Sequence, residues 1–236
     1  MKLFKYHCYT IATTIEEVKN QMTSLDYELE GTDMKNLIAF NHTYLIITRN
    51  VYDKLNTEYF ADDELMKKTD VCFGNYYFDA LHQYINTNDC PPAWRILFDA
   101  CRRNDTYQFV YMAMGVNAHV NNDLPQTLHD VMKGNICKED YEYINDIIGY
   151  SISEVVDALD EKNVFLHLSE HLGTLFYTQF LKYIICKWRS RAWNQYIDLN
   201  NGLIFVDAVE KEAQKKAIIL AKIQKIYQIP SIMKIC

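Results

Sequence analysis

A histidine and an aspartate four residues apart, His119 and Asp123, are the residues whose types and spacing best suggest chemistry. On a helix, residues four apart share one face at about 6 Å, close enough to bind one cation together. The stripe that carries them begins with Met112 and Val116, so the pair is predicted to face the core. Burying an imidazole and a carboxylate is costly unless they pair or bind a metal. The sequence therefore predicts a metal site or an internal His–Asp hydrogen bond.

The neighbours of this pair are also polar. Asn117 and Asn121 form a second pair at helical spacing alongside it, and Asn122 adds a further amide. Pro125 lacks a backbone donor and crowds the carbonyl of Asn121, so we expect the helix to break or kink beside Asp123. A carbonyl freed there would be a further ligand. Gly115 costs about 1 kcal/mol relative to alanine within a helix and indicates close approach of a neighbouring helix.

Helices must position these residues, because the composition disfavours other folds. The chain has 236 residues with only seven glycines and four prolines, too few for the frequent turns of a β-sandwich or barrel. Apolar residues at helical spacing and capping signals, including the capping box Thr14–Glu17, predict helices at about 15–29, 33–55, 62–85, 91–101, 107–125, 138–158, 162–197 and 206–228. We expect a single all-α domain over residues 1–236, a bundle of about seven or eight helices.

Charge and cysteine usage exclude several classes of protein. The net charge of −7 disfavours nucleic acid as a partner. The seven cysteines contain no C-x-x-C pair, and the first residues lack the apolar region of a signal peptide. No run of apolar residues is long enough to span a membrane. These features predict a cytoplasmic protein with reduced thiols and no membrane span. A small-molecule ligand or substrate is a candidate partner. The sequence leaves the oligomeric state open.

The segment 115–125, GVNAHVNNDLP, resembles the signature of a family of helical bacterial domains of unknown function. That family carries a G-[MIV]-N-A-H-[IV]-N-x-D-L core. Further pieces that look like it are Phe73–Leu81, the segment around Trp94 and Phe98, and Arg189–Trp193, so the resemblance extends over most of the chain. It implies an all-helical fold and no particular reaction.

A more distant similarity concerns spacing alone. His119, Asp123 and His129 repeat the H-x3-D-x5-H spacing of bacterial zinc phospholipase C and the related single-strand nucleases. In those enzymes the histidine and aspartate bind zinc ions that activate water against a phosphodiester. This chain departs from them, because it has no second H-x3-E/D just downstream, no N-terminal tryptophan ligand and no secretion signal. The similarity implies at most a phosphoester substrate.

Three other histidines are candidate metal ligands. His167, Glu170 and His171 match the H-x-x-E-H pattern of inverted zinc peptidases, in which two histidines hold zinc and the glutamate acts as base. Leucines share this helix and no third ligand follows, so a surface or core pair is the simpler interpretation. If this helix packs against the helix that carries His119, His167 or His171 completes the ligand set begun by His119. His82 is a further candidate, or else a histidine at a helix end.

An arginine and a tryptophan late in the chain, Arg189 and Trp193, are candidates for the same site. Arg189 could present its cation to an anionic substrate or to an internal carboxylate such as Asp123.

Two functions therefore remain open. The first is a metal-dependent hydrolase in which zinc, manganese or iron at His119 and Asp123 activates water. The second is a non-catalytic binding or scaffold protein, in which the Asn-Ala-His-x-Asn-x-Asp motif is a buried hydrogen-bond network that fixes helix register and lines a small-molecule pocket.

Overall fold

The fold is built from helices throughout the part of the chain that the structure describes. The structure, a computed structural model, describes residues 2–87, 89–132, 138–160 and 174–227. Within these ranges there is no β-strand, and extended pairing is limited to one isolated bridge between Lys2 and Thr32. The all-α fold predicted from the composition is confirmed.

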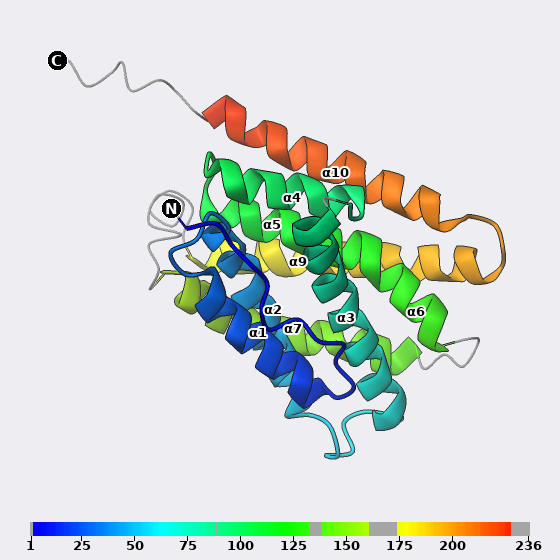
Figure 1. The fold of residues 1–236 in the computed structure, drawn as a ribbon. Coiled ribbons are helices and arrows are strands. Elements are labelled where there is room, and N and C mark those ends of the chain that lie inside the picture. The colour runs from blue at the N-terminus through cyan, green and yellow to red at the C-terminus, as the bar shows by residue number, and fades with distance from the viewer. Residues whose placement is uncertain (1, 88, 133–137, 161–173, 228–236) are drawn as a thin grey trace, which may run out of the picture.

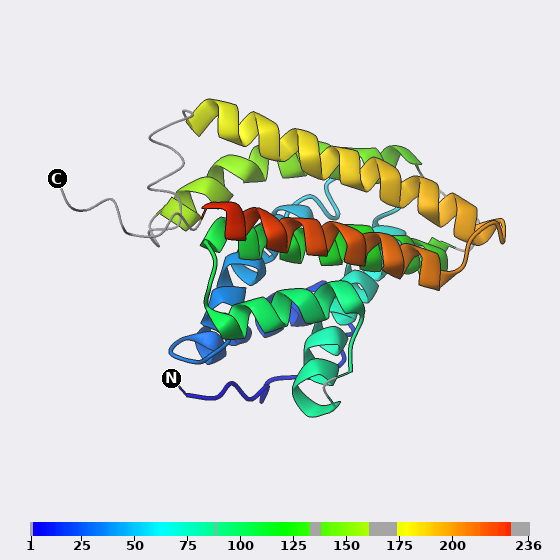
Figure 2. The same cartoon turned by 90° about the horizontal axis from the view of Figure 1, so that it is seen from above.

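The helices follow one another along the chain as Figures 1 and 2 show. They are α1 (Ile15–Leu29), α2 (Ile38–Tyr52), α3 (Asp63–Thr87), α4 (Pro92–Arg103), α5 (Gln108–Ala118), α6 (Leu124–Met132), α7 (Lys138–Asp160), α9 (Thr174–Asn200) and α10 (Val206–Tyr227). A short 3₁₀ turn (Lys35–Leu37) precedes α2, and a π turn (η2, His119–Asp123) joins α5 to α6.

Local sequence signals account for the helix starts. The Thr14 hydroxyl accepts the Glu17 N–H at 3.1 Å, as the predicted capping box requires. The Glu17 carboxylate returns to the N–H of Thr13 at 2.6 Å rather than to that of Thr14. Pro92 is the first residue of α4, where its missing N–H costs no hydrogen bond.

Some predicted bounds were wrong. Helix α2 ends at Tyr52, three residues before the predicted end, and α9 continues to Asn200. Of the helix predicted at 162–197, the residues before Thr174 lie outside the described residues. The predicted break beside Asp123 is absent, because the chain continues through the π turn into α6.

Helix α5 lies inside the bundle, in contact with α2, α4 and α10 (Figures 1 and 2). A Cβ atom on Gly115 would lie 2.3 Å from Cγ of Phe40, so the glycine is needed for α2 to approach this closely. The close approach predicted for Gly115 is therefore confirmed.

Two further predictions concern thiols and membranes. Of the cysteines that the structure describes, Cys8, Cys72, Cys90, Cys101 and Cys186 are all free thiols. Among the described helices, none combines the length and the apolar character needed to span a bilayer.

Candidate functional site

The π turn sets the positions of His119 and Asp123. The N–H of Leu124, which follows the turn, bonds to the carbonyl of His119, five residues back. Pro125, one residue later, has no N–H to donate and would crowd a carbonyl four residues back in a regular α-helix. The wider turn accommodates this proline without ending the helix. Single π turns are rare within helices and are frequent at functional sites.

Asp123 is completely buried, and its carboxylate accepts hydrogen bonds from three neighbours. Trp94 Nε1 lies 3.1 Å from Oδ1 and 3.0 Å from Oδ2. Asn122 Nδ2 donates to Oδ1 at 2.8 Å, and His119 Nδ1 lies 3.0 Å from Oδ2. Each carboxylate oxygen therefore already accepts from two donors. In this arrangement Asp123 orients the ring of His119.

The hydrogen bond to Asp123 also decides the tautomer of His119. A carboxylate only accepts hydrogen bonds, so the proton of the imidazole must lie on Nδ1. Burial lowers the pKa of His119, against the opposing effect of the hydrogen bond to Asp123. The imidazole is therefore neutral at pH 7, with a lone pair on Nε2.

Aromatic rings hold the imidazole in place. The Phe73 ring stacks on it with the ring centres 3.5 Å apart and the planes 7° apart. The Tyr44 ring meets it edge-on, with the centres 4.3 Å apart. Nε2 of His119 is buried and has no hydrogen-bond partner within the described residues. An orphaned acceptor on an otherwise fixed ring indicates a place for a ligand.

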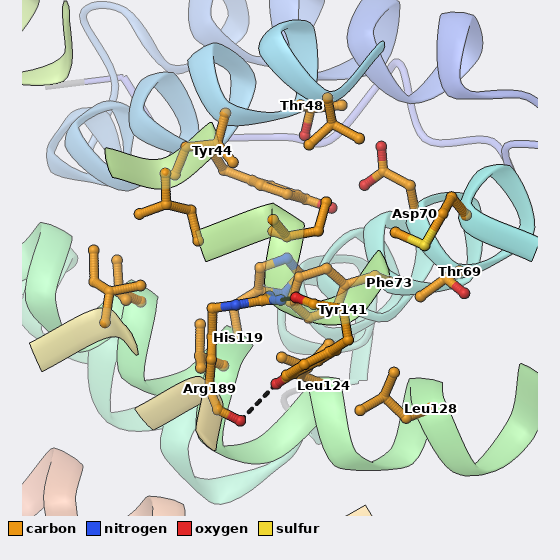
Figure 3. A pocket seen from close by; sticks show the side chains of 18 of the residues that line it. Tyr44, Thr48, Thr69, Asp70, Phe73, His119, Leu124, Leu128, Tyr141 and Arg189 are labelled. Atoms are coloured by element: carbon orange, nitrogen blue, oxygen red, sulfur yellow. Dashed lines mark hydrogen bonds between the residues drawn. The ribbon is translucent and has the colours of Figure 1, made fainter. Parts of the chain in front are cut away.

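His119 borders a cavity of about 90 Å³, shown in Figure 3. A cavity needs only about 10–15 Å³ to hold one water, so this one has room for a small organic group. Its walls come from α2, α3, α7, α9 and the α5–α6 segment. Most lining side chains are apolar. The groups with polar atoms that matter here are Tyr44, Thr48, Asp70, His119 and Arg189.

Asp70 is an acid within this apolar wall. The residue as a whole is half-buried, but its Oδ2 atom is enclosed and lacks a hydrogen-bond partner in the described parts of the chain. Burial raises the pKa of Asp70 to about 7. The buried hydroxyls of Tyr44 and Thr48 likewise form no hydrogen bond of good geometry with a described residue. Asp70 therefore exchanges between its neutral and charged forms near physiological pH.

Arg189 supplies a buried cation from α9. Its Nε donates to Oδ1 of Asn145 and its Nη2 to the carbonyl of Tyr141, each at 2.8 Å. The guanidinium also lies over the Tyr141 ring, 4.3 Å from the centre. Burial lowers the pKa of Arg189. No ion pair joins it to a carboxylate of the described chain, so the pairing with Asp123 considered from the sequence is not found.

The two asparagines of the motif have a different set of contacts. Asn117 Nδ2 donates to the carbonyl of Ala213 on α10 at 3.0 Å, and Asn121 Nδ2 donates to Oδ1 of Asn117 at 3.2 Å. Lys216 Nζ, also on α10, donates to Oδ1 of Asn121 at 2.6 Å. These bonds connect the motif to α10 and do not involve the cavity.

The remaining predicted site residues do not join His119. His82 stacks on Tyr9, with ring centres 4.0 Å apart, and bonds to Asn86. His129 is exposed on α6. Trp193 packs on Tyr141, with ring centres 4.7 Å apart, and lies outside the cavity wall.

The described part of the chain does not contain the complete ligand set that the predicted metal site needs. There, no group of three or more histidine, cysteine, aspartate or glutamate side chains could hold a metal ion. His167, Glu170 and His171 lie outside the described residues, so their part in a metal site stays a prediction.

Sequence reasoning missed Asp70 and Trp94 as site residues. A signal for Asp70 was present, because Met66, Asp70 and Phe73 follow one helical stripe with the same spacing as Met112, Val116 and His119. A carboxylate on an apolar stripe indicates a buried acid. Trp94 gave no such signal, since only the fold brings its indole to Asp123.

The model of one family matches residues 15–226 of the chain, and its description is "Family of unknown function (DUF5995)". No curated protein and no solved structure matches.

Proposed function

Because the chain belongs to the family DUF5995, whose function is unknown, we propose a function from the site itself: the chain binds a small molecule in the His119 cavity. One observation carries this proposal. Nε2 of a buried, neutral and rigidly held imidazole borders an apolar cavity and has no hydrogen-bond partner among the described residues. Leaving such a group unpaired costs about 1–3 kcal/mol, which a ligand with a donor recovers.

The same geometry supports proton transfer. An imidazole whose Nδ1–H is held by a carboxylate is arranged as a general base at Nε2. We propose that His119 accepts a proton or hydrogen bond from the ligand, and that Asp123 fixes the ring and stabilises the imidazolium when it forms. The apolar wall strengthens this interaction because it excludes water.

A metal-dependent hydrolase is the second candidate, favoured by the same free Nε2 atom. In that case His119 binds the metal through Nε2, and Asp123 acts through His119 as an outer-sphere partner. Elemental analysis of the protein purified without an affinity tag tests it. About one equivalent of zinc, manganese or iron, lost in His119→Ala, would support the hydrolase. Wild-type protein that takes up none of these ions would remove it.

Phenol and toluene form a matched pair of probes for the binding site, because they share a shape and only phenol has a donor. We expect calorimetry to show that wild type binds phenol about three- to tenfold more tightly than toluene. This preference should disappear in His119→Phe and persist in the control variant His129→Phe, which changes an exposed histidine on the neighbouring helix. Equal binding of the two probes by wild type would overturn the proposal.

A further inference from the structure

Arg189 and a second cavity with a mostly apolar wall define the class of ligand more closely. We infer that the site binds a monocarboxylic acid with a hydrocarbon chain, a free fatty acid, with its carboxylate at Arg189 and its chain in the second cavity. This inference rests on the proposed function and specifies its ligand.

The first argument is the charge of Arg189. Arg189 is 5% exposed and lines the His119 cavity. Its hydrogen bonds go to an amide oxygen and a backbone carbonyl, and no carboxylate of the described residues forms an ion pair with it. A buried cation without a counterion is unfavourable. A carboxylate ligand supplies the missing negative charge and suits the geometry of a guanidinium.

The second argument is the shape of the neighbouring space. A cavity of about 220 Å³ adjoins the first one, and the two share wall residues Thr43, Ile47, Val116 and Ile185. Apart from Thr43, its wall consists of apolar side chains and Trp188, contributed by α2, α5, α7, α9 and α10. Such a wall offers nothing to a polar ligand and fits a hydrocarbon chain.

Helix α9 connects the two ends of this site. Leu181 and Ile185 line the hydrocarbon cavity, and Arg189 lies one turn further on the same face. A molecule lying along α9 therefore places its charged head at Arg189 and its chain beside Ile185 and Leu181. Asp70 lines the first cavity from α3 and Arg189 lines it from α9.

Octanoate and 1-octanol test the inference, because they share a chain and differ in charge. Calorimetry of the full chain at pH 8 should show that octanoate binds. Octanol should bind at least tenfold more weakly, because it carries no charge to pair with Arg189. Affinity should rise about three- to fourfold for each CH₂ from butyrate to decanoate.

Ala113→Phe fills the hydrocarbon cavity and provides a second variant. It should weaken decanoate binding at least tenfold and leave butyrate binding unchanged. If octanol binds as well as octanoate, the fatty-acid inference is wrong while the cavity still binds ligands. If neither compound binds and phenol fails as well, the proposed function itself is wrong.

Discussion

The two polar pairs of the motif, Asn117/Asn121 and His119/Asp123, lie on one stretch of helix and differ in how completely they are hydrogen-bonded. Both asparagine amides bond to each other or to α10, through Ala213 and Lys216. The His–Asp pair is equally buried, but its Nε2 atom, on the cavity wall, has no hydrogen-bond partner among the residues that the structure describes.

This difference separates a structural role from a binding role. A buried network whose groups are all paired fixes the position of helices. A network of the same polarity with an orphaned acceptor on a cavity wall leaves a free-energy cost that a ligand recovers. The asparagine pair therefore holds α10 against the core, and the His–Asp pair presents Nε2 to the cavity.

Removing the carboxylate of Asp123 should give the largest effect. Asp123→Ala leaves Trp94 Nε1, Asn122 Nδ2 and His119 Nδ1 without their acceptor in a fully buried place. We expect a loss of about 3–5 kcal/mol in the free energy of unfolding, measured by urea denaturation. A loss below about 1 kcal/mol would mean that the network does not hold His119 in place.

Asp70→Asn should stabilise the protein in a pH-dependent way. The pKa of Asp70 is raised to about 7 in the folded state, so the folded state binds its proton more tightly than the unfolded state. Its contribution to stability is therefore complete below about pH 4 and is lost as the pH rises to about 7. Since Asp70 is partly exposed, we expect Asp70→Asn to gain about 1–3 kcal/mol at pH 8 and little at pH 4. Thermal unfolding at both pH values measures this, and equal effects at the two would contradict it.

Asn117→Ala should loosen α10 and leave the cavity intact. The variant removes the hydrogen bond to Ala213 and the acceptor for Asn121. We expect a loss of about 1–2 kcal/mol, with faster amide exchange in α10 and unchanged phenol binding. If phenol binding fell as strongly as in His119→Phe, the two halves of the motif would not be separate in function.

Lys216→Met should have the smallest effect. Lys216 bonds to Asn121 and to Glu212 but is only partly buried, and methionine keeps most of its hydrocarbon contacts. We expect a loss of about 0.5–1 kcal/mol, measured by urea denaturation beside Asn117→Ala. A loss larger than that of Asn117→Ala would place the main connection to α10 at the lysine instead.

Much of the fold could be predicted from local patterns. Apolar spacing gave the all-α class, and capping residues such as Thr14 and Pro92 gave helix starts. The conformation around Pro125 could not be predicted in this way. A proline within a helical pattern allows either a break or a wider turn, and packing on both sides of the helix selects the turn here.

The site was predictable only in part. The inward direction of His119 and Asp123 followed from the apolar stripe. Their burial in turn predicted either a metal site or the mutual hydrogen bond that the structure contains. The contact between Asp123 and Trp94 depends on how α4 packs against the π turn, which local periodicity does not contain. For the same reason the sequence could not exclude His82, whose ring lies beside Tyr9 instead.

The protonation and tautomer of His119 are the most direct test of the account. Nitrogen-15 NMR of the imidazole, followed from pH 8 to pH 5, reports both. The account predicts a proton on Nδ1, a bare Nε2 and a ring that becomes protonated only at a lower pH than an ordinary histidine, whose pKa is about 6.5. A proton on Nε2 at pH 8, or a ring that titrates at or above pH 6.5, would contradict it.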